Sequence, residues 1–182
     1  CYEAIHTTFD WLPLAALIGG NVLVLHGGLG AGTWGLADLE RVSRPLSTDR
    51  PAGKDFRVVV DALWSDPADS DAEMRKGVHC NWTRLGLSRP PADDAPAPGS
   101  AGKERKSAVE SARGSLAAAE LLAAEHDGGL GASSAVLEFG ADVTRAFCAR
   151  EGISLVIRAH QFVPHGYKYM HGGRLITLFS AR

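Results

Sequence analysis

The fold class follows from one stretch near the start of the chain, Val22-Leu23-Val24-Leu25-His26-Gly27-Gly28. A short continuous apolar run bounded by turn signals is typical of a strand that is buried on both faces. Gly19-Gly20 precedes the run, and the glycine-rich segment 26–35 follows it as a loop. We therefore predict a strand over 22–25 that ends at His26, beside glycines that allow close backbone approach to a ligand.

A second apolar run ends in the same way. Residues 154–157 predict a strand, and Arg158-Ala159-His160 follows it directly. Imidazole is a common ligand of transition metals, and a strand end holds a ligand more firmly than a loose loop does. A lone histidine after a strand is more often a hydrogen-bonded structural residue. Two histidines at equivalent strand ends leave the metal-ligand and the structural interpretation both open.

The rest of the chain alternates helical and extended patterns. This alternation indicates an α/β fold, in which functional sites form in the loops at the carboxyl ends of strands. We expect helices over 2–18 (with a break at Pro13), 36–42 and 143–151, and strands over 58–60, 167–170 and 175–179, the last two as a hairpin.

The segment 88–134 differs from its surroundings in composition. It is rich in alanine, proline, glycine and serine, and within it residues 103–126 carry a helical pattern whose apolar face is mostly alanine. We interpret 88–134 as a low-complexity insertion within a single domain that spans 1–182.

Composition excludes several classes of protein. A 182-residue chain with 45% hydrophobic residues, 22% charged residues and a net charge of −2 is ordinary for a globular domain and gives no sign of nucleic-acid binding. The most apolar stretch, 12–29, is interrupted by Pro13 and Gly19-Gly20, so we expect no membrane span. Three widely spaced cysteines favour a reducing compartment, cytoplasmic or nuclear. The chain begins at Cys1, which predicts processing or a partial sequence.

Several further residues have plain structural interpretations. Asp66, Asp69 and Asp71 lack the glycine and the closing glutamate of a calcium loop, so we interpret them as loop acids, with Asp66 near the site. We expect three histidines at the surface and three tryptophans in the core: His79, His165, His171, and Trp11, Trp34, Trp64.

The order of four motifs resembles the metal-dependent serine/threonine protein phosphatases of the phosphoprotein phosphatase (PPP) family. The motifs are His26-Gly27-Gly28-Leu29, Leu63-Trp64-Ser65-Asp66-Pro67, Arg158-Ala159-His160-Gln161 followed by Gly166-Tyr167, and Leu175-Ile176-Thr177-Leu178-Phe179-Ser180-Ala181. They cover nearly the whole chain except the insertion. The resemblance implies the C-terminal half of that family's catalytic domain, a two-sheet β-sandwich flanked by helices.

The same resemblance implies a chemistry. Members of the family hold two metal ions (manganese, iron or zinc) that clamp a phosphate and activate a water molecule. By resemblance, His26 and His160 would both ligate the second metal. Arg84, in Asn81-Trp82-Thr83-Arg84-Leu85-Gly86, is the nearest match to the arginine that grips the substrate phosphate, although the spacing differs by one residue. The implied partners are phosphoprotein substrates and regulatory subunits, with neither nucleic acid nor membrane.

Three motifs of the family do not occur in the chain: GDxHG, GDxVDRG and GNHE. In the family they supply the other ligands of both metals and the histidine general acid. Because stable zinc- or iron-type sites need three or four protein ligands, we expect this chain to be inactive on its own. The alternative is a phosphatase-like module that binds partners without catalysis.

Overall fold

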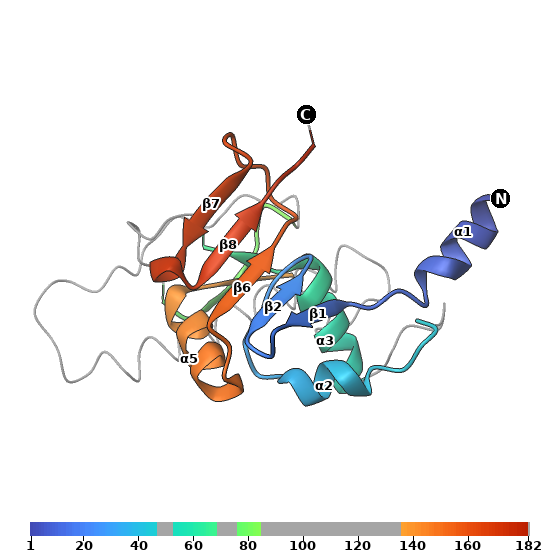
Figure 1. Ribbon diagram of the computed structural model, residues 1–182, viewed down its shortest axis with the longest axis horizontal. Helices are drawn as coiled ribbons and strands as arrows, with labels where there is room; N and C mark the ends of the chain where they lie inside the picture. Colours follow the sequence, from blue (N-terminus) through green and yellow to red (C-terminus); the bar gives the residue numbers. More distant parts are fainter. Residues whose placement is uncertain (47–52, 69–75, 85–135, 182) are drawn as a thin grey trace, which may run out of the picture.

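The computed structural model describes residues 1–46, 53–68, 76–84 and 136–181 (Figure 1). The predicted insertion, 88–134, and the loop acids Asp69 and Asp71 lie outside these residues. Within the described ranges no helix combines the length and the apolar character that crossing a membrane requires. Cys1, Cys80 and Cys148 are all free thiols.

Two sheets organise the chain. The large sheet has the strand order β1 (Ala15–Ile18), β2 (Val22–Leu25), β6 (Leu155–Arg158), β8 (Leu175–Leu178) and β7 (Tyr167–Met170). Its three inner strands are parallel, and the edge strands β1 and β7 run antiparallel to their neighbours. The small sheet has the order β3 (Asp66–Pro67), β5 (Leu137–Phe139) and β4 (Val78–Cys80).

The helices are short. Among the described residues they are α1 (Tyr2–Phe9), α2 (Leu36–Arg41), α3 (Gly53–Trp64), α5 (Ala141–Glu151) and the 3-10 turn η2 (His171–Gly173). Helices α2, α3 and α5 contribute residues to the apolar core or pack against it. Side chains from one face of the large sheet meet residues of α3, α5 and β5 in this core, which includes Leu23, Val156, Leu175, Val58, Phe147 and Phe139. Helix α1 buries none of its residues and projects from the rest of the fold (Figure 1). This mixed α/β architecture with two sheets and flanking helices confirms the predicted fold class.

Several predicted elements are confirmed with small shifts at their ends. The strands that precede His26 and His160 are present as β2 and β6, and the hairpin is present as β7 and β8. The helix predicted over 36–42 is α2, and the helix predicted over 143–151 is the C-terminal part of α5.

Two predicted elements are wrong. Residues 58–60 are helical, because Val58 and Ala62, four residues apart, both enter the core from α3. The helix predicted over 2–18 ends at Phe9, and residues 15–18 form β1, which pairs with β2. Gly19 and Gly20 lie in the turn that joins β1 to β2, with φ of 59° and 77°. Ile18 pairs with Val22, so the hairpin loop has three residues, 19–21, and positive φ at its first two positions favours glycine.

The glycine-rich loop after β2 packs against the end of α3. Gly27 N donates to Ala62 O at 2.7 Å, and Gly28 N donates to Asp61 O at 3.0 Å. A Cβ atom on Gly27 would lie 2.5 Å from the backbone carbon of Leu63. A Cβ atom on Gly28 would overlap the ring of Phe139. The loop therefore fits between the end of α3 and the Phe139 ring of β5 only with glycine at both positions.

We predict that Gly28→Ala lowers the free energy of unfolding by about 1–3 kcal/mol, the usual cost of overpacking a core. The double variant with Phe139→Leu should lose about 1 kcal/mol less free energy of unfolding than the sum of the two single losses. The reason is that the smaller leucine leaves space for the added Cβ atom at position 28. Urea unfolding of the four chains measures this coupling.

The control is the same cycle with Phe147→Leu. Phe147 is equally buried, but its atoms are not among the three nearest to the added Cβ. Additive losses in both cycles would contradict the contact between Gly28 and Phe139.

Candidate metal and phosphate site

The two histidines predicted as metal ligands converge. His26 directly follows β2, and His160 lies two residues beyond β6, the parallel neighbour of β2. Ala159 N donates to His26 O at 3.0 Å, which ties the two strand ends together. The distance between His26 Nε2 and His160 Nδ1 is 3.1 Å. Two residues 134 positions apart are thus neighbours because adjacent parallel strands end at the same edge.

The backbone and a tryptophan fix the His160 ring. His160 has a φ of 65°, in the left-handed region that few non-glycine residues adopt. Such backbone strain is typical of functional positions. The Trp64 ring packs edge-on against the imidazole, with 5.4 Å between the ring centroids. His160 Nε2 is buried and has no hydrogen-bond partner among the described residues.

Asp66 links the residues around the histidines. Its carboxylate is nearly inaccessible and accepts hydrogen bonds from Arg158 Nη2, Arg84 Nε and Asn81 Nδ2, each at 2.8 Å. Arg84 also donates to the backbone oxygen of His160 at 3.1 Å. The predicted phosphate-binding arginine therefore lies beside the histidine pair, with about a third of its side chain exposed.

Arg158 is the most deeply buried charged side chain of the site. Besides Asp66, it donates to Gly27 O at 2.6 Å, to Ser65 O at 3.2 Å and to Gln161 Oε1 at 2.8 Å. Burial lowers the pKa of its guanidinium to about 10, partly offset by Asp66. The group remains a cation at neutral pH.

The pKa values of His26 and His160 are both lowered, which favours the neutral imidazole. Burial lowers the pKa of His160 to about 4; Asp66 opposes this shift, and Arg84 and Arg158 add to it. Burial, with Arg158 and Arg84, also lowers the pKa of His26. A neutral imidazole keeps the lone pair that a metal ion requires.

The two imidazole nitrogens can supply part of the ligand set of one metal ion. Two ligands at about 2.1 Å from a shared ion lie about 3 Å apart when their bonds are near a right angle, which matches the separation of the two ring nitrogens. No group of three or more histidine, cysteine, aspartate or glutamate side chains with metal-binding geometry occurs in the described part of the chain. The pair can therefore supply two ligands, and a complete site needs others.

The predicted burial of the other histidines and of the tryptophans is confirmed at some positions and wrong at others. His165 is exposed, as predicted, and Trp34 is in the core, where its ring packs against Phe147. His171 is buried, which corrects the surface prediction, because its Nδ1 bonds with Thr144 Oγ1 at 2.8 Å and its ring contacts Phe139. Trp11 and Trp64 are more than half exposed, so they are not core residues.

The sequence patterns assigned no role to Asn81, Arg158 or Gln161, which appeared only as members of the quoted motifs. A charged residue at the end of an otherwise apolar strand was the one available signal for Arg158, because such a side chain needs a buried partner.

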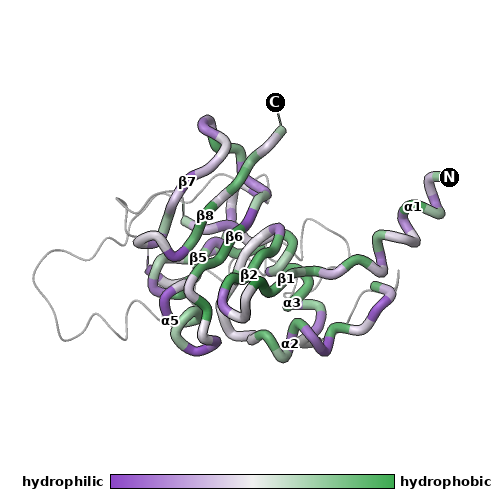
Figure 2. The backbone as a smooth tube through the Cα atoms, viewed as in Figure 1, coloured by the Kyte–Doolittle hydropathy of each residue, from purple (hydrophilic) through white to green (hydrophobic). Residues whose placement is uncertain are grey.

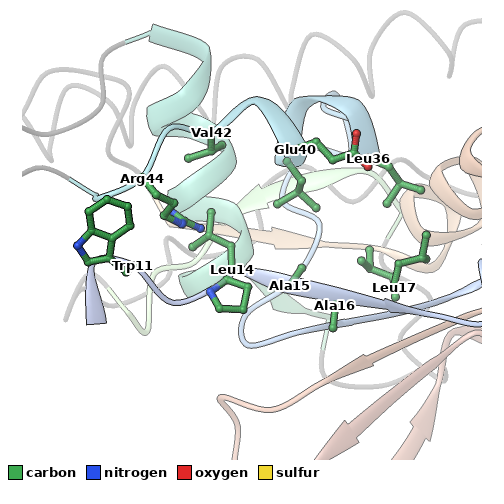
Figure 3. Close-up of a pocket in the computed structure, with 12 residues that line it drawn as sticks. Trp11, Leu14, Ala15, Ala16, Leu17, Leu36, Glu40, Val42 and Arg44 are labelled. Atoms are coloured by element: carbon green, nitrogen blue, oxygen red, sulfur yellow. The ribbon is translucent and has the colours of Figure 1, made fainter. Parts of the chain in front are cut away.

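An apolar groove lies elsewhere, between β1 and α2. Leu14, Leu17, Leu36 and Arg44 are among the side chains that line it (Figure 3). Neither histidine lines it, and neither does Arg84. The groove is therefore separate from the polar site.

Sequence comparison identifies the family. The profile of calcineurin-like phosphoesterases matches residues 2–164. The chain belongs to this family of phosphoesterases. Its relatives include human serine/threonine-protein phosphatase 5, which is 27% identical over 99% of this chain and 24% of the human protein. Another is serine/threonine-protein phosphatase PP1-delta of Caenorhabditis elegans, 29% identical over 99% of this chain and 40% of the worm protein.

Structural comparison agrees on the fold. A protein serine/threonine phosphatase from Saccharomyces cerevisiae superposes with a TM-score of 0.57 at 22% identity, over 99% of this chain and 38% of the yeast chain. The resemblance to the serine/threonine phosphatases is thereby confirmed. The present chain spans less than half the length of each of these three proteins.

We predict that Arg158→Met destabilises the fold by about 3–5 kcal/mol, the cost of removing one partner from a buried ion pair. The matched control is Arg41→Met. Arg41 also pairs with an aspartate, but 70% of its side chain is exposed, so its loss should cost less than about 1 kcal/mol. Thermal and urea unfolding compare the two variants. Equal losses would contradict the role assigned to Arg158.

Proposed function

We propose that this chain is part of a phosphoprotein phosphatase that hydrolyses phosphoserine and phosphothreonine. His26 and His160 would be ligands of one metal ion, and Arg84 would bind the substrate phosphate. One observation carries the proposal: the ring nitrogens of the two histidines are 3.1 Å apart, and the Arg84 guanidinium bonds to the backbone of the second histidine.

Each residue has a definite task in this scheme. The histidines present neutral nitrogens at a fixed separation, since β2 and β6 hold their backbones. Arg84 offers a planar fork of donors, which suits phosphate oxygens. Asp66 orients that fork through Arg84 Nε. When bound, the metal ions would clamp the phosphate and supply a hydroxide for in-line attack.

The proposal makes this chain incomplete as a catalyst. Its two histidines leave at least one metal ligand to be supplied by other residues. Whether the metals are manganese, iron or zinc depends on those ligands. Phosphoproteins would be the substrates, regulatory subunits further partners, and the cytoplasm or nucleus the setting. No observation favours the alternative of a binding module without catalysis.

We predict weak binding of Co²⁺ by the chain, detected as quenching of Trp64 fluorescence, because the Trp64 ring packs against His160. The test uses a Cys1→Ser background, since the exposed Cys1 thiol would bind the ion independently. His26→Ala and His160→Ala should each weaken binding at least tenfold, roughly the smallest loss typical of changes around a metal site.

Two controls locate the signal. His165→Ala, at an exposed loop histidine, should leave Co²⁺ affinity unchanged, and Trp64→Phe should remove the quenching. Equal affinity in the wild type and the His26→Ala and His160→Ala variants would contradict the metal assignment.

We also predict that the purified chain with added Mn²⁺ shows no turnover of p-nitrophenyl phosphate above the buffer rate. The reason is the missing ligands, since two-metal hydrolysis needs both ions held in place. Activity that co-purifies with the chain and disappears in His26→Ala would show that this half suffices.

A further inference from the structure

The groove between β1 and α2 has the size and the lining of a small-molecule site. Its volume is about 420 Å³, within the range of about 300–1,000 Å³ that is typical of ligand pockets. Hydrophobic residues run along β1, which forms one side of the groove (Figure 2). Of the twelve residues that line it, only Glu40 and Arg44 carry a charge. A stable protein interface needs about 20–30 residues on each side, so this groove is better matched to a small molecule.

Arg44 brings an unpaired donor into this apolar groove. It lies three residues beyond the end of α2. Its Nη1 atom is buried and has no hydrogen-bond partner among the described residues. Burial also lowers the pKa of the guanidinium. A buried donor on a cation loses its hydration without compensation, so binding of an anion at this atom is favourable.

The two charged residues lie apart along the groove. Figure 3 shows the Arg44 guanidinium at the end where Trp11 and Leu14 lie, and the Glu40 carboxylate at the opposite end, with Leu36. Glu40 therefore does not pair with Arg44 Nη1. A channel that is apolar along its length and has a cation at one end fits a molecule with an anionic head and an apolar tail. The separation of the charges also fixes the direction in which such a molecule lies.

We propose that this groove binds an alkyl carboxylate, a linear hydrocarbon chain that ends in one carboxylate group. The carboxylate accepts a hydrogen bond from Arg44 Nη1, and the planar guanidinium can offer a second donor to it. The alkyl chain lies along Leu14, Leu17 and Leu36 and displaces water from their side chains.

Both parts of the ligand are needed. A small inorganic anion would pair with Arg44 but leave the leucines in contact with water, whereas a neutral hydrocarbon would leave Nη1 without a partner. Neither histidine of the candidate metal site lines the groove, and neither does Arg84. The carboxylate site therefore goes beyond the proposed function and does not depend on it.

The test is calorimetric titration of the chain with octanoate, decanoate and dodecanoate, each below its micelle concentration. Affinity should rise about threefold to fourfold with each added methylene group, the factor that burial of one methylene contributes. Dodecanol has the same chain and no charge, and it should bind at least about tenfold more weakly than dodecanoate, because it loses a hydrogen bond between charged groups. Equal affinity for the alcohol and the carboxylate would overturn the role of Arg44.

Two pairs of variants locate the ligand. Arg44→Gln should weaken dodecanoate binding about tenfold and leave dodecanol binding unchanged, since the glutamine has no charge. Its control is Arg41→Gln, at an arginine that is 70% exposed and does not line the groove. Leu17→Ser should weaken both ligands, whereas Leu178→Ser should weaken neither. The two leucines are 47% and 44% exposed, but only Leu17 lines the groove.

Each other outcome has a definite meaning. Circular dichroism checks that the variants fold. Equal dodecanoate affinity in the wild type, Arg44→Gln and Leu17→Ser would show adsorption to the surface only and overturn the site. A dimer of the chain that Leu17→Ser dissociates and dodecanoate does not would assign the groove to a second copy of the chain and overturn the ligand.

One further variant separates this site from the metal proposal. His26→Ala should leave dodecanoate affinity unchanged, because His26 does not line the groove. A chain that binds dodecanoate through Arg44 but binds no Co²⁺ would support the carboxylate site and refute the metal assignment. A chain that binds Co²⁺ through its histidines but binds no alkyl carboxylate would do the reverse.

Discussion

The buried ion pair between Arg158 and Asp66 joins the two sheets, and the candidate site depends on it. Arg158 ends β6 of the large sheet, and Asp66 begins β3 of the small sheet. Both side chains are almost inaccessible, and the charges face each other at 2.8 Å. A buried pair stabilises a fold only when every remaining donor and acceptor is satisfied. Here the backbone oxygens of Gly27 and Ser65, with Gln161, accept from Arg158, and Asn81 donates to Asp66.

The same contacts set the position of each functional group. Arg158 holds the backbone of Gly27, the residue after His26, while Asp66 holds Arg84. The glycine-rich loop can lie this close to α3 because its backbone amides, not side chains, face the helix. The stability of the fold and the geometry of the site are therefore coupled, since the Asp66 carboxylate and the Arg158 guanidinium contribute to both.

Sequence patterns located the strands that carry the histidines, because a continuous apolar run followed by glycines has few other structural interpretations. They failed where local preference and tertiary context disagree. Val58, Val59 and Val60 are β-branched but helical, and the segment predicted as a helix up to residue 18 ends in a strand that the turn at Gly19-Gly20 joins to β2. The partners of Asp66 were beyond reach, since they lie 15, 18 and 92 residues away in sequence and meet only in the fold. Likewise, the burial of His171 follows from its contact with Thr144, which no local pattern encodes.

The charges of the site themselves argue that it is one side of a larger centre. Two guanidiniums and one carboxylate surround two neutral imidazoles, which leaves an excess of one positive charge. That excess suits a phosphate dianion but opposes the binding of metal cations, because like charges in a poorly solvated region repel strongly. Holding two metal ions beside Arg84 and Arg158 therefore requires several more carboxylates. Under the proposed function, those carboxylates would be supplied by residues other than the histidine pair and Asp66.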